Sequence, residues 1–282
     1  MGVLAKLFIS LVIITVSCHG YAWNALAHMV IADIAYEQLK PDVRKKVDIM
    51  VADLSQEYPD INQFSHIAPW PDKLRSQRIE LYTHWHYINL AFSDDGTALK
   101  DMSDTDNAVW AINALLPIIS NPKANPHERA RSLAFLVHIV GDLHQPLHAI
   151  TRISAAHPDG DHGGNLYYIK YPAVKPQKIS MHKLWDQGTD LFTMPVSDSN
   201  AASLSAFIVN LFPYEYFGEL VNDLASDHWA NEGLAISSSF VYSTPPNVVP
   251  DTSYLQTAKQ VAEQRAALAG YRLANILNKI LV

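Results

Sequence analysis

Apolar residues recur every three or four positions along most of the chain, which is the spacing of amphipathic helices. The pattern is clearest from Leu26 onward and again in the last stretch, from about Tyr254 to Leu281. Further helices are expected over residues 41–52, 105–119, 126–145 and 181–186, and from residue 229 onward. No linker-like stretch, internal repeat or low-complexity segment separates them. The pattern therefore predicts an all-α fold, with a single mainly helical domain.

Two stretches depart from this spacing. Residues 55–76 carry several prolines, and we expect them to be irregular. Residues 82–90 alternate histidine with aromatic residues, a period of two that predicts an extended segment. In such a segment His84 and His86 would point to the same side.

The first 22 residues have the organisation of a secretory signal peptide. Lys6 precedes an apolar run from Leu7 to Val16, which is too short to span a bilayer comfortably. Gly20 and Ala22 provide the small residues that signal peptidases favour three residues before the cleaved bond and directly before it. We therefore expect cleavage after Ala22 and no stable membrane anchor.

Cleavage there would leave a mature domain of residues 23–282 that contains no cysteine, so disulfides cannot stabilise it. The chain also lacks an Asn-x-Ser/Thr glycosylation site, which favours a bacterial origin and a periplasmic or secreted location. Cys18 leaves a lipoprotein interpretation open, although Thr15 stands where such signals usually carry leucine.

The chain is acidic, with a formal net charge of −7, which becomes −8 once Lys6 is removed with the signal. This negative net charge argues against a protein that binds nucleic acid through a broad basic surface. If the substrate is a phosphate ester, bound divalent cations must bring positive charge to the site.

The densest candidate chemistry lies between His138 and His148. His138 and Asp142 are four residues apart in an apolar helical stretch, so they share one face of the helix. Pro146 should end or kink the helix and let His148 turn toward the same place. Hydrogen-bonded core histidines would explain one such residue, but three histidines and an aspartate within eleven residues favour a metal site.

Other segments could complete the set of ligands. His182 and Asp186 repeat the spacing of four, and the α-amine and carbonyl of Trp23 could chelate a metal. Histidine and carboxylate without thiolate is the ligand combination of catalytic zinc, although manganese or iron would be tolerated. The nine candidate ligands are Trp23, His28, Asp72, His86, His138, Asp142, His148, His182 and Asp186. The remaining histidines are expected at the surface or behind the ligands: His66, His84, His127, His144, His157, His162 and His228.

Six motifs in this order resemble the S1/P1 nuclease family, which is related in fold to the bacterial zinc-dependent phospholipases C. They are Trp-x-x-x-x-His from residue 23, Trp-Pro-Asp at 70–72, Trp-His-Tyr-Ile at 85–88, His-x-x-x-Asp-x-His-Gln-Pro-Leu-His from 138, Gly-Gly-Asn at 163–165 and His-x-x-x-Asp from 182. The likeness extends from Trp23 to the Ala-Gly-Tyr-Arg-Leu-Ala stretch near the end.

The resemblance implies a cleft with three zinc ions. The ligand sets that it implies are Asp72, His86, His138 and Asp142 for one ion, Trp23, His28 and the shared Asp142 for a second, and His148, His182 and Asp186 for the third. Substrate would bind through Tyr87, which takes the place of the aromatic residue that stacks on a nucleobase, and through Asn165 near the phosphate. Asn89 stands where the family nuclease has an aspartate that reads the base, so the base preference stays open.

The implied activity is hydrolysis of single-stranded DNA or RNA to 5′-phosphate products, with 3′-nucleotidase activity alongside. The zinc ions would activate water and stabilise the leaving oxygen, and Asp72 would orient or deprotonate the nucleophile. We expect a monomer whose substrates are single-stranded nucleic acid or nucleotides. The alternatives are a zinc-dependent phospholipase C acting on phosphatidylcholine-type lipids and a metal-binding protein without catalysis.

Overall fold

One helix, α6 (Pro126–His144), forms the centre of the molecule, which a computed structural model describes over residues 23–282. Its side chains from Ser132 to His144 are all buried, because the helix packs against α2 (Pro41–Ser55), α5 (Ala108–Ser120), α9 (Ser226–Ser239) and α10 (Thr252–Ile280). Asn125 caps its first turn by accepting hydrogen bonds from the backbone of His127 and Glu128, as the Asn-Pro sequence predicts.

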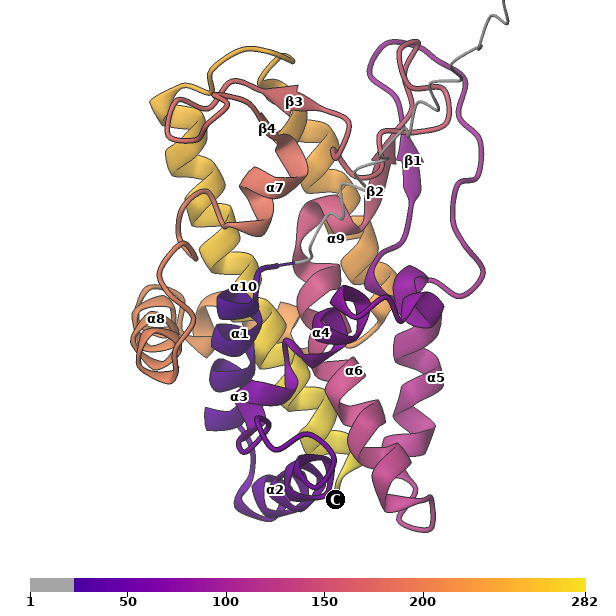
Figure 1. The fold of residues 1–282 in the computed structure, drawn as a ribbon, viewed down its shortest axis with the longest axis vertical. Helices are drawn as coiled ribbons and strands as arrows, with labels where there is room; N and C mark the ends of the chain where they lie inside the picture. The colour runs from indigo at the N-terminus through magenta and orange to yellow at the C-terminus, as the bar shows by residue number, and fades with distance from the viewer. Residues whose placement is uncertain (1–22) are drawn as a thin grey trace, which may run out of the picture.

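The first helix of the described chain, α1 (Ala25–Glu37), lies between α10 and α8 (Asp198–Leu211) and also contacts α6 (Figure 1). Two glycines permit these close approaches. A Cβ atom built on Gly270 of α10 would lie 2.6 Å from Ile34, and one on Gly141 of α6 would lie 3.0 Å from the His28 ring. The absence of side chains at both positions lets α1 sit close to both helices.

The strands are few and short, and they gather at one end of the molecule with α7 (Met181–Asp186) (Figure 1). β1 (Leu90–Phe92) pairs in parallel with β2 (Ile150–Arg152), and β3 (Tyr168–Ile169) pairs antiparallel with β4 (Ile179–Ser180). Short 3₁₀ segments lie at Pro146–His148 (η2), Tyr214–Asn222 (η3) and Val241–Ser243 (η4). The structure confirms the prediction of a single mainly helical domain.

Two local predictions are wrong in part. Residues 56–63 are irregular as expected, but the chain then forms α3 (Phe64–Ile67) and α4 (Trp70–Ser76). Pro71 falls in the first turn of α4, where no backbone donor is needed. Residues 82–86, predicted to be extended, lie in the 3₁₀ segment η1 (Glu80–His86), whereas the backbone is extended at Tyr87 and β1 begins at Leu90. With about three residues per turn, side chains two apart diverge, so His84 and His86 do not share a side.

The signal-peptide prediction concerns residues 1–22, which lie outside the described residues. Within residues 23–282, no helix combines the length and the apolar character that crossing a bilayer requires.

Candidate metal centre

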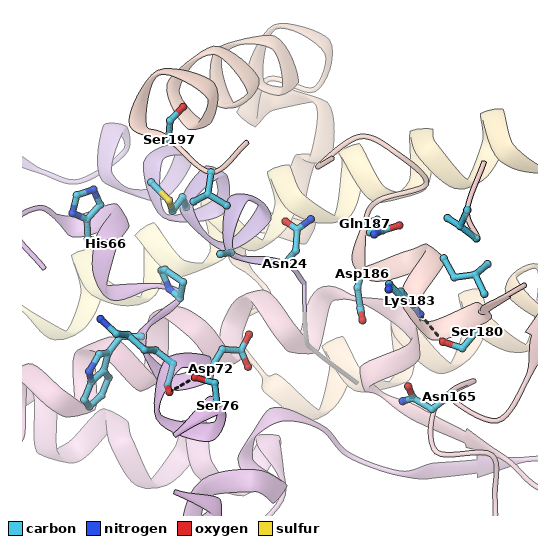
Figure 2. A pocket seen from close by; sticks show the side chains of 18 of the residues that line it. Asn24, His66, Asp72, Ser76, Asn165, Ser180, Lys183, Asp186, Gln187 and Ser197 are labelled. Atoms are coloured by element: carbon cyan, nitrogen blue, oxygen red, sulfur yellow. Dashed lines mark hydrogen bonds between the residues drawn. The ribbon is translucent and has the colours of Figure 1, made fainter. Parts of the chain in front are cut away.

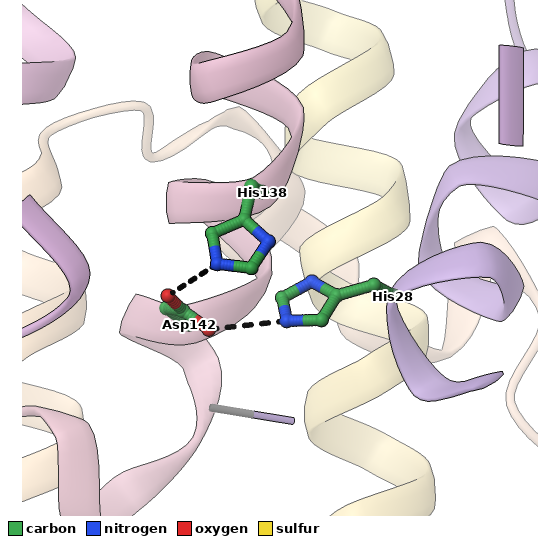
Figure 3. A group of neighbouring side chains, drawn as sticks. All are labelled: His28, His138 and Asp142. Carbon is green, nitrogen blue, oxygen red and sulfur yellow. Dashed lines mark ion pairs between the residues drawn. The ribbon is translucent and has the colours of Figure 1, made fainter. Parts of the chain in front are cut away.

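Two helices bring the first group of ligands together. His138 and Asp142 lie one turn apart on α6, and His28 reaches them from α1 (Figure 3). The His138 Nε2 atom is 3.1 Å from Asp142 Oδ2, and the His28 Nε2 atom is 3.2 Å from Asp142 Oδ1. The two imidazole rings stack with centroids 4.0 Å apart, and all three side chains are buried. One carboxylate therefore faces a histidine nitrogen with each of its oxygens.

A second group shares His138 with the first. The Nδ1 atom of His86, at the end of η1, lies 2.9 Å from His138 Nε2 and 3.1 Å from Asp142 Oδ2. Asp72, in the first turn of α4, places its Oδ1 atom 3.8 Å from both histidine nitrogens. Asp72, His86 and His138 thus offer three ligand atoms within 4.8 Å of one another.

The third group forms where the chain turns after α6. His148 lies in η2, and its Nε2 atom is 3.6 Å from Asp186 Oδ1, while His182 Nε2 is 3.4 Å from Asp186 Oδ2. His148 Nδ1 is also 3.9 Å from Asp142 Oδ1, which places this group beside the other two. Pro146 does end the helix as predicted, and the 3₁₀ turn directs His148 toward Asp142.

Backbone carbonyl groups orient three of these rings. The Nδ1 atoms of His138, His148 and His182 lie 2.7–2.8 Å from the carbonyl oxygens of Ala68, His86 and Gly163. An Nδ1–H that donates to a carbonyl leaves the Nε2 lone pair free, which is the usual second-shell arrangement of metal-binding histidines.

Several buried atoms have no hydrogen-bond partner within residues 23–282. Four of them are candidate ligand atoms, His28 Nε2, Asp72 Oδ1, Asp142 Oδ1 and His148 Nε2, and a fifth is His28 Nδ1 on the same ring; the others lie on Trp23, Arg44, Asp53, Trp70, Ser226 and Arg265. A buried polar atom without a partner is costly, and a bound cation satisfies it. Nitrogen and oxygen donors without sulfur suit zinc, so the residues present fit such an ion.

The electrostatics of the centre agree with this fit. Burial alone would raise the pKa of the Asp142 carboxyl, but His138 and His148 outweigh it and hold that pKa well below its usual range. At His148 burial would lower the pKa, but Asp142 and Asp186 outweigh it and raise the pKa to about 9. Burial lowers the pKa of His28. An ionised carboxylate enclosed by imidazoles is a strong attractor of positive charge.

The centre opens onto a cleft of about 1000 Å³ (Figure 2). Asp72 and Asp186, from two of the three groups, both line it, and Asn24 and Asn165 lie between or beside them. A substrate that enters the cleft would therefore meet carboxylates of the metal centre.

The four other predicted site residues lie around this centre and differ in how far they are buried: Trp23, Tyr87, Asn89 and Asn165. The Trp23 ring is fully buried against Phe192, and the neighbouring Asn24 N–H donates to the Asp186 carbonyl at 3.2 Å, so the Trp23 main chain runs past α7. Asn165 lines the cleft and its amide donates to the His162 carbonyl.

Tyr87 and Asn89, the other two, follow His86 and are half-buried. The start of α5 and the loop before it hold them: the Tyr87 carbonyl accepts from the N–H of Ala108, the first residue of α5, at 2.9 Å, and the Asn89 carbonyl accepts from the Ser103 hydroxyl at 3.5 Å. Neither residue is among those that line the cleft.

Sequence reasoning missed one support of the centre. Gln145 donates from Nε2 to Asp186 Oδ1 at 2.7 Å, although its place inside the motif before Pro146 could have indicated this. His144, the last residue of α6, is one of the histidines expected at the surface or behind the ligands; it is fully buried, and Arg272 of α10 donates to its Nε2 atom at 3.1 Å. The pKa of His144 lies well below its usual range because of burial and of the positive charges of Arg265 and Arg272, so this ring is neutral.

Taken together, a mainly helical domain with three clustered histidine–aspartate groups at a cleft defines a candidate metallohydrolase. Comparison with known proteins identifies the family. The model of the S1/P1 nuclease family matches residues 23–282, which is the whole described chain, so the protein belongs to the S1/P1 nuclease family.

Individual relatives cover nearly the same span. The chain is 24% identical to Nuclease P1 of Penicillium citrinum, over 92% of this chain and 97% of the relative. It is 24% identical to Nuclease S1 of Aspergillus oryzae, over 92% of each chain, and 24% identical to Endonuclease 2 of Arabidopsis thaliana, over 93% and 91%. The protein is accordingly a hydrolase, a nuclease that cleaves phosphodiester bonds of nucleic acids.

Proposed function

We propose that this nuclease is zinc-dependent, that it cleaves single-stranded DNA and RNA to 5′-phosphate products, and that it also removes the phosphate of 3′-nucleotides. The observation that carries the proposal is the sharing of ligands. Asp142 faces His28, His86 and His138 within 3.2 Å, and His148 within 3.9 Å, so the three groups form one centre.

We propose the ligand sets that the family resemblance implies, and the three groups of ligand atoms that lie within 4.8 Å of one another support them. Asp72, His86, His138 and Asp142 would hold one ion, the Trp23 amine and carbonyl with His28 and Asp142 would hold a second, and His148, His182 and Asp186 would hold the third. When bound, such ions would supply the Lewis acidity that makes water a nucleophile at neutral pH and that stabilises the departing oxyanion.

The remaining steps belong to the chain itself. The carboxylate of Asp72 lines the cleft and sits 3.8 Å from two of the ligand nitrogens, so it orients the attacking water and accepts its proton. Asn165 donates to a phosphate oxygen from the opposite side of the cleft. Tyr87 is not among the residues that line the cleft, but it directly follows the candidate ligand His86, and we assign it the role of stacking on a nucleobase. A base inside a duplex could not stack there, so this role would favour single strands.

Comparing substrates with and without a chelator tests this function. The protein should cleave single-stranded DNA and dephosphorylate 3′-AMP, it should cut duplex DNA poorly, and all three activities should disappear with EDTA and return with zinc. Turnover of phosphatidylcholine without cleavage of nucleic acid would instead favour the phospholipase, for which the apolar residues Ile61, Ile179 and Val196 of the cleft offer a surface.

We also propose that residues 1–22 are removed on export to the periplasm or the medium, and that residues 23–282 act as a monomer. The free amine of Trp23 then becomes a ligand. Its main chain already runs beside Asp186, as the hydrogen bond of Asn24 indicates.

Adding one alanine before Trp23 should therefore remove a ligand atom from the second site. We expect the extended protein to contain about one zinc ion less per chain and to lose activity by about 10²-fold or more, because each catalytic metal contributes several kcal/mol. Mass spectrometry and metal analysis check the variant, with one alanine added after Val282 as the matched control. Full activity of the extended protein would remove Trp23 from the set of ligands.

A further inference from the structure

One wall of the cleft is basic, although the chain as a whole carries a formal net charge of −7. Between Asp161 and Asp186 the sequence contains four lysines and no aspartate or glutamate. Three of these, Lys175, Lys178 and Lys183, line the cleft, and all three are exposed. We call these three residues the lysine wall.

The β3–β4 hairpin and α7 hold the lysine wall in place. Tyr168 of β3 pairs with Ser180 of β4, and Ser180 caps α7 by accepting from the backbone of Lys183. Lys178 lies between the two strands and places its ammonium group 4.5 Å from the centroid of the Tyr168 ring, which also lines the cleft. The wall therefore combines positive charge with an aromatic face.

The ammonium groups of the lysine wall are not neutralised by neighbouring carboxylates among the described residues. Among residues 23–282, none of the three lysines forms an ion pair within 4.0 Å. On the opposite side of the cleft the charges are paired, since Lys73 lies 3.2 Å from Asp60 and His66 lies 2.8 Å from Asp198. The unpaired positive charge of the cleft is thus concentrated on one wall.

The lysine wall begins at the metal centre. Figure 2 shows Lys183 and Ser180 on the same side as Asp186 and Asn165, across the cleft from Asp72 and His66. At about 1000 Å³ the cleft is at the upper end of the usual range for a small-ligand pocket, about 300–1000 Å³. It therefore has room for more than the phosphate that reacts.

We propose that Lys175, Lys178 and Lys183, with Tyr168, form a subsite for the nucleic acid strand beyond the phosphodiester that is cleaved. The lysines bind the following phosphates, and the Tyr168 ring offers a stacking face to a base. This combination is typical of surfaces that bind single strands. The inference rests on the proposed function and adds to it a preference for polymers over mononucleotides, determined outside the metal centre.

The double variant K175A/K178A tests the subsite and leaves the residue next to His182 untouched. We expect the KM for a single-stranded oligonucleotide to rise about tenfold while its kcat changes less than twofold, because these lysines contact phosphates that do not react. The KM for 3′-AMP, which has no further phosphate, should change less than twofold. The slope of log KM against log salt should fall by about 1.4, since each phosphate contact contributes about 0.7 for single strands.

The matched control is K123A/K279A, which removes the same charge at exposed positions away from the cleft. An equal rise of KM in this control, or an unchanged KM and salt slope in K175A/K178A, would overturn the subsite. Loss of binding to vesicles of phosphatidylglycerol without any change toward the oligonucleotide would also overturn it. If the unaltered protein fails to cleave the oligonucleotide at all with zinc present, the proposed function fails, and that result is separate from any effect of the lysines.

Discussion

Replacing Asp142 by asparagine should lower the activity on single-stranded DNA by at least about 10³-fold. The substitution preserves the size of the side chain but removes the charge that His28, His86 and His138 face within 3.2 Å. Two of the proposed zinc sites share this carboxylate, and a catalytic metal contributes several kcal/mol of transition-state stabilisation. Because metal binding contributes folding free energy, the thermal unfolding midpoint should fall as well.

Metal analysis, steady-state kinetics and thermal unfolding of the same preparation check this prediction. Asp42→Asn is the matched control, because Asp42 is an exposed carboxylate in the first turn of α2. A variant at Asp142 that keeps its full metal content and more than a tenth of its activity would contradict the shared-ligand arrangement.

The second large effect should be on stability and should arise behind the metal centre. Glu232 of α9 accepts two hydrogen bonds from Arg272, at 2.8 and 2.6 Å, and it also pairs with Arg265. Arg272 is fully buried, and its guanidinium also donates to the Leu220 carbonyl and lies over the Trp229 ring. One carboxylate thus balances two buried guanidinium groups.

Replacing Glu232 by glutamine should lower the free energy of unfolding by about 3 kcal/mol. Removing one partner of a buried ion pair costs about 3–5 kcal/mol, and the lower end applies because a quarter of the Glu232 side chain is exposed. Urea unfolding of the metal-loaded protein measures the change, with Glu219→Gln, an exposed glutamate of η3, as the control. A loss below about 1 kcal/mol would show that the two arginines do not depend on this carboxylate.

The pairs of candidate ligands were predictable because their spacing along the chain is local. The spacing of four residues in His138–Asp142 and His182–Asp186 fixes a shared helical face whatever the rest of the fold does. Pro146 marks the end of the helix for the same reason, since it cannot continue the hydrogen-bonding pattern. That these pairs meet His28, His86 and Asp72 was inferred from the residue types and from the family resemblance.

Other features depend on long-range packing and could not be predicted locally. The contact between His144 and Arg272 joins residues 128 positions apart, and nothing near either residue indicates the other. The alternation of histidine and aromatic residues around His84 and His86 suggested a strand, but packing of Tyr82 and Trp85 against Phe135 favours a 3₁₀ turn there.

The lysine wall is a third such case. Its lysines are visible in the sequence, but only the fold shows that they share a cleft with Asp186. The run without acidic residues between Asp161 and Asp186 is the one signal that could have indicated it.

The role of metal is tested most directly by measuring the metal content of the protein while a chelator removes the ions stepwise. Protein that begins at Trp23 should contain about three zinc ions per chain, and stepwise addition of EDTA should lower the metal content, the activity and the unfolding midpoint together. Zinc should restore all three. A protein that cleaves single-stranded DNA at its full rate with less than one divalent ion per chain would contradict the central claim that the clustered histidine–aspartate groups work by binding metal.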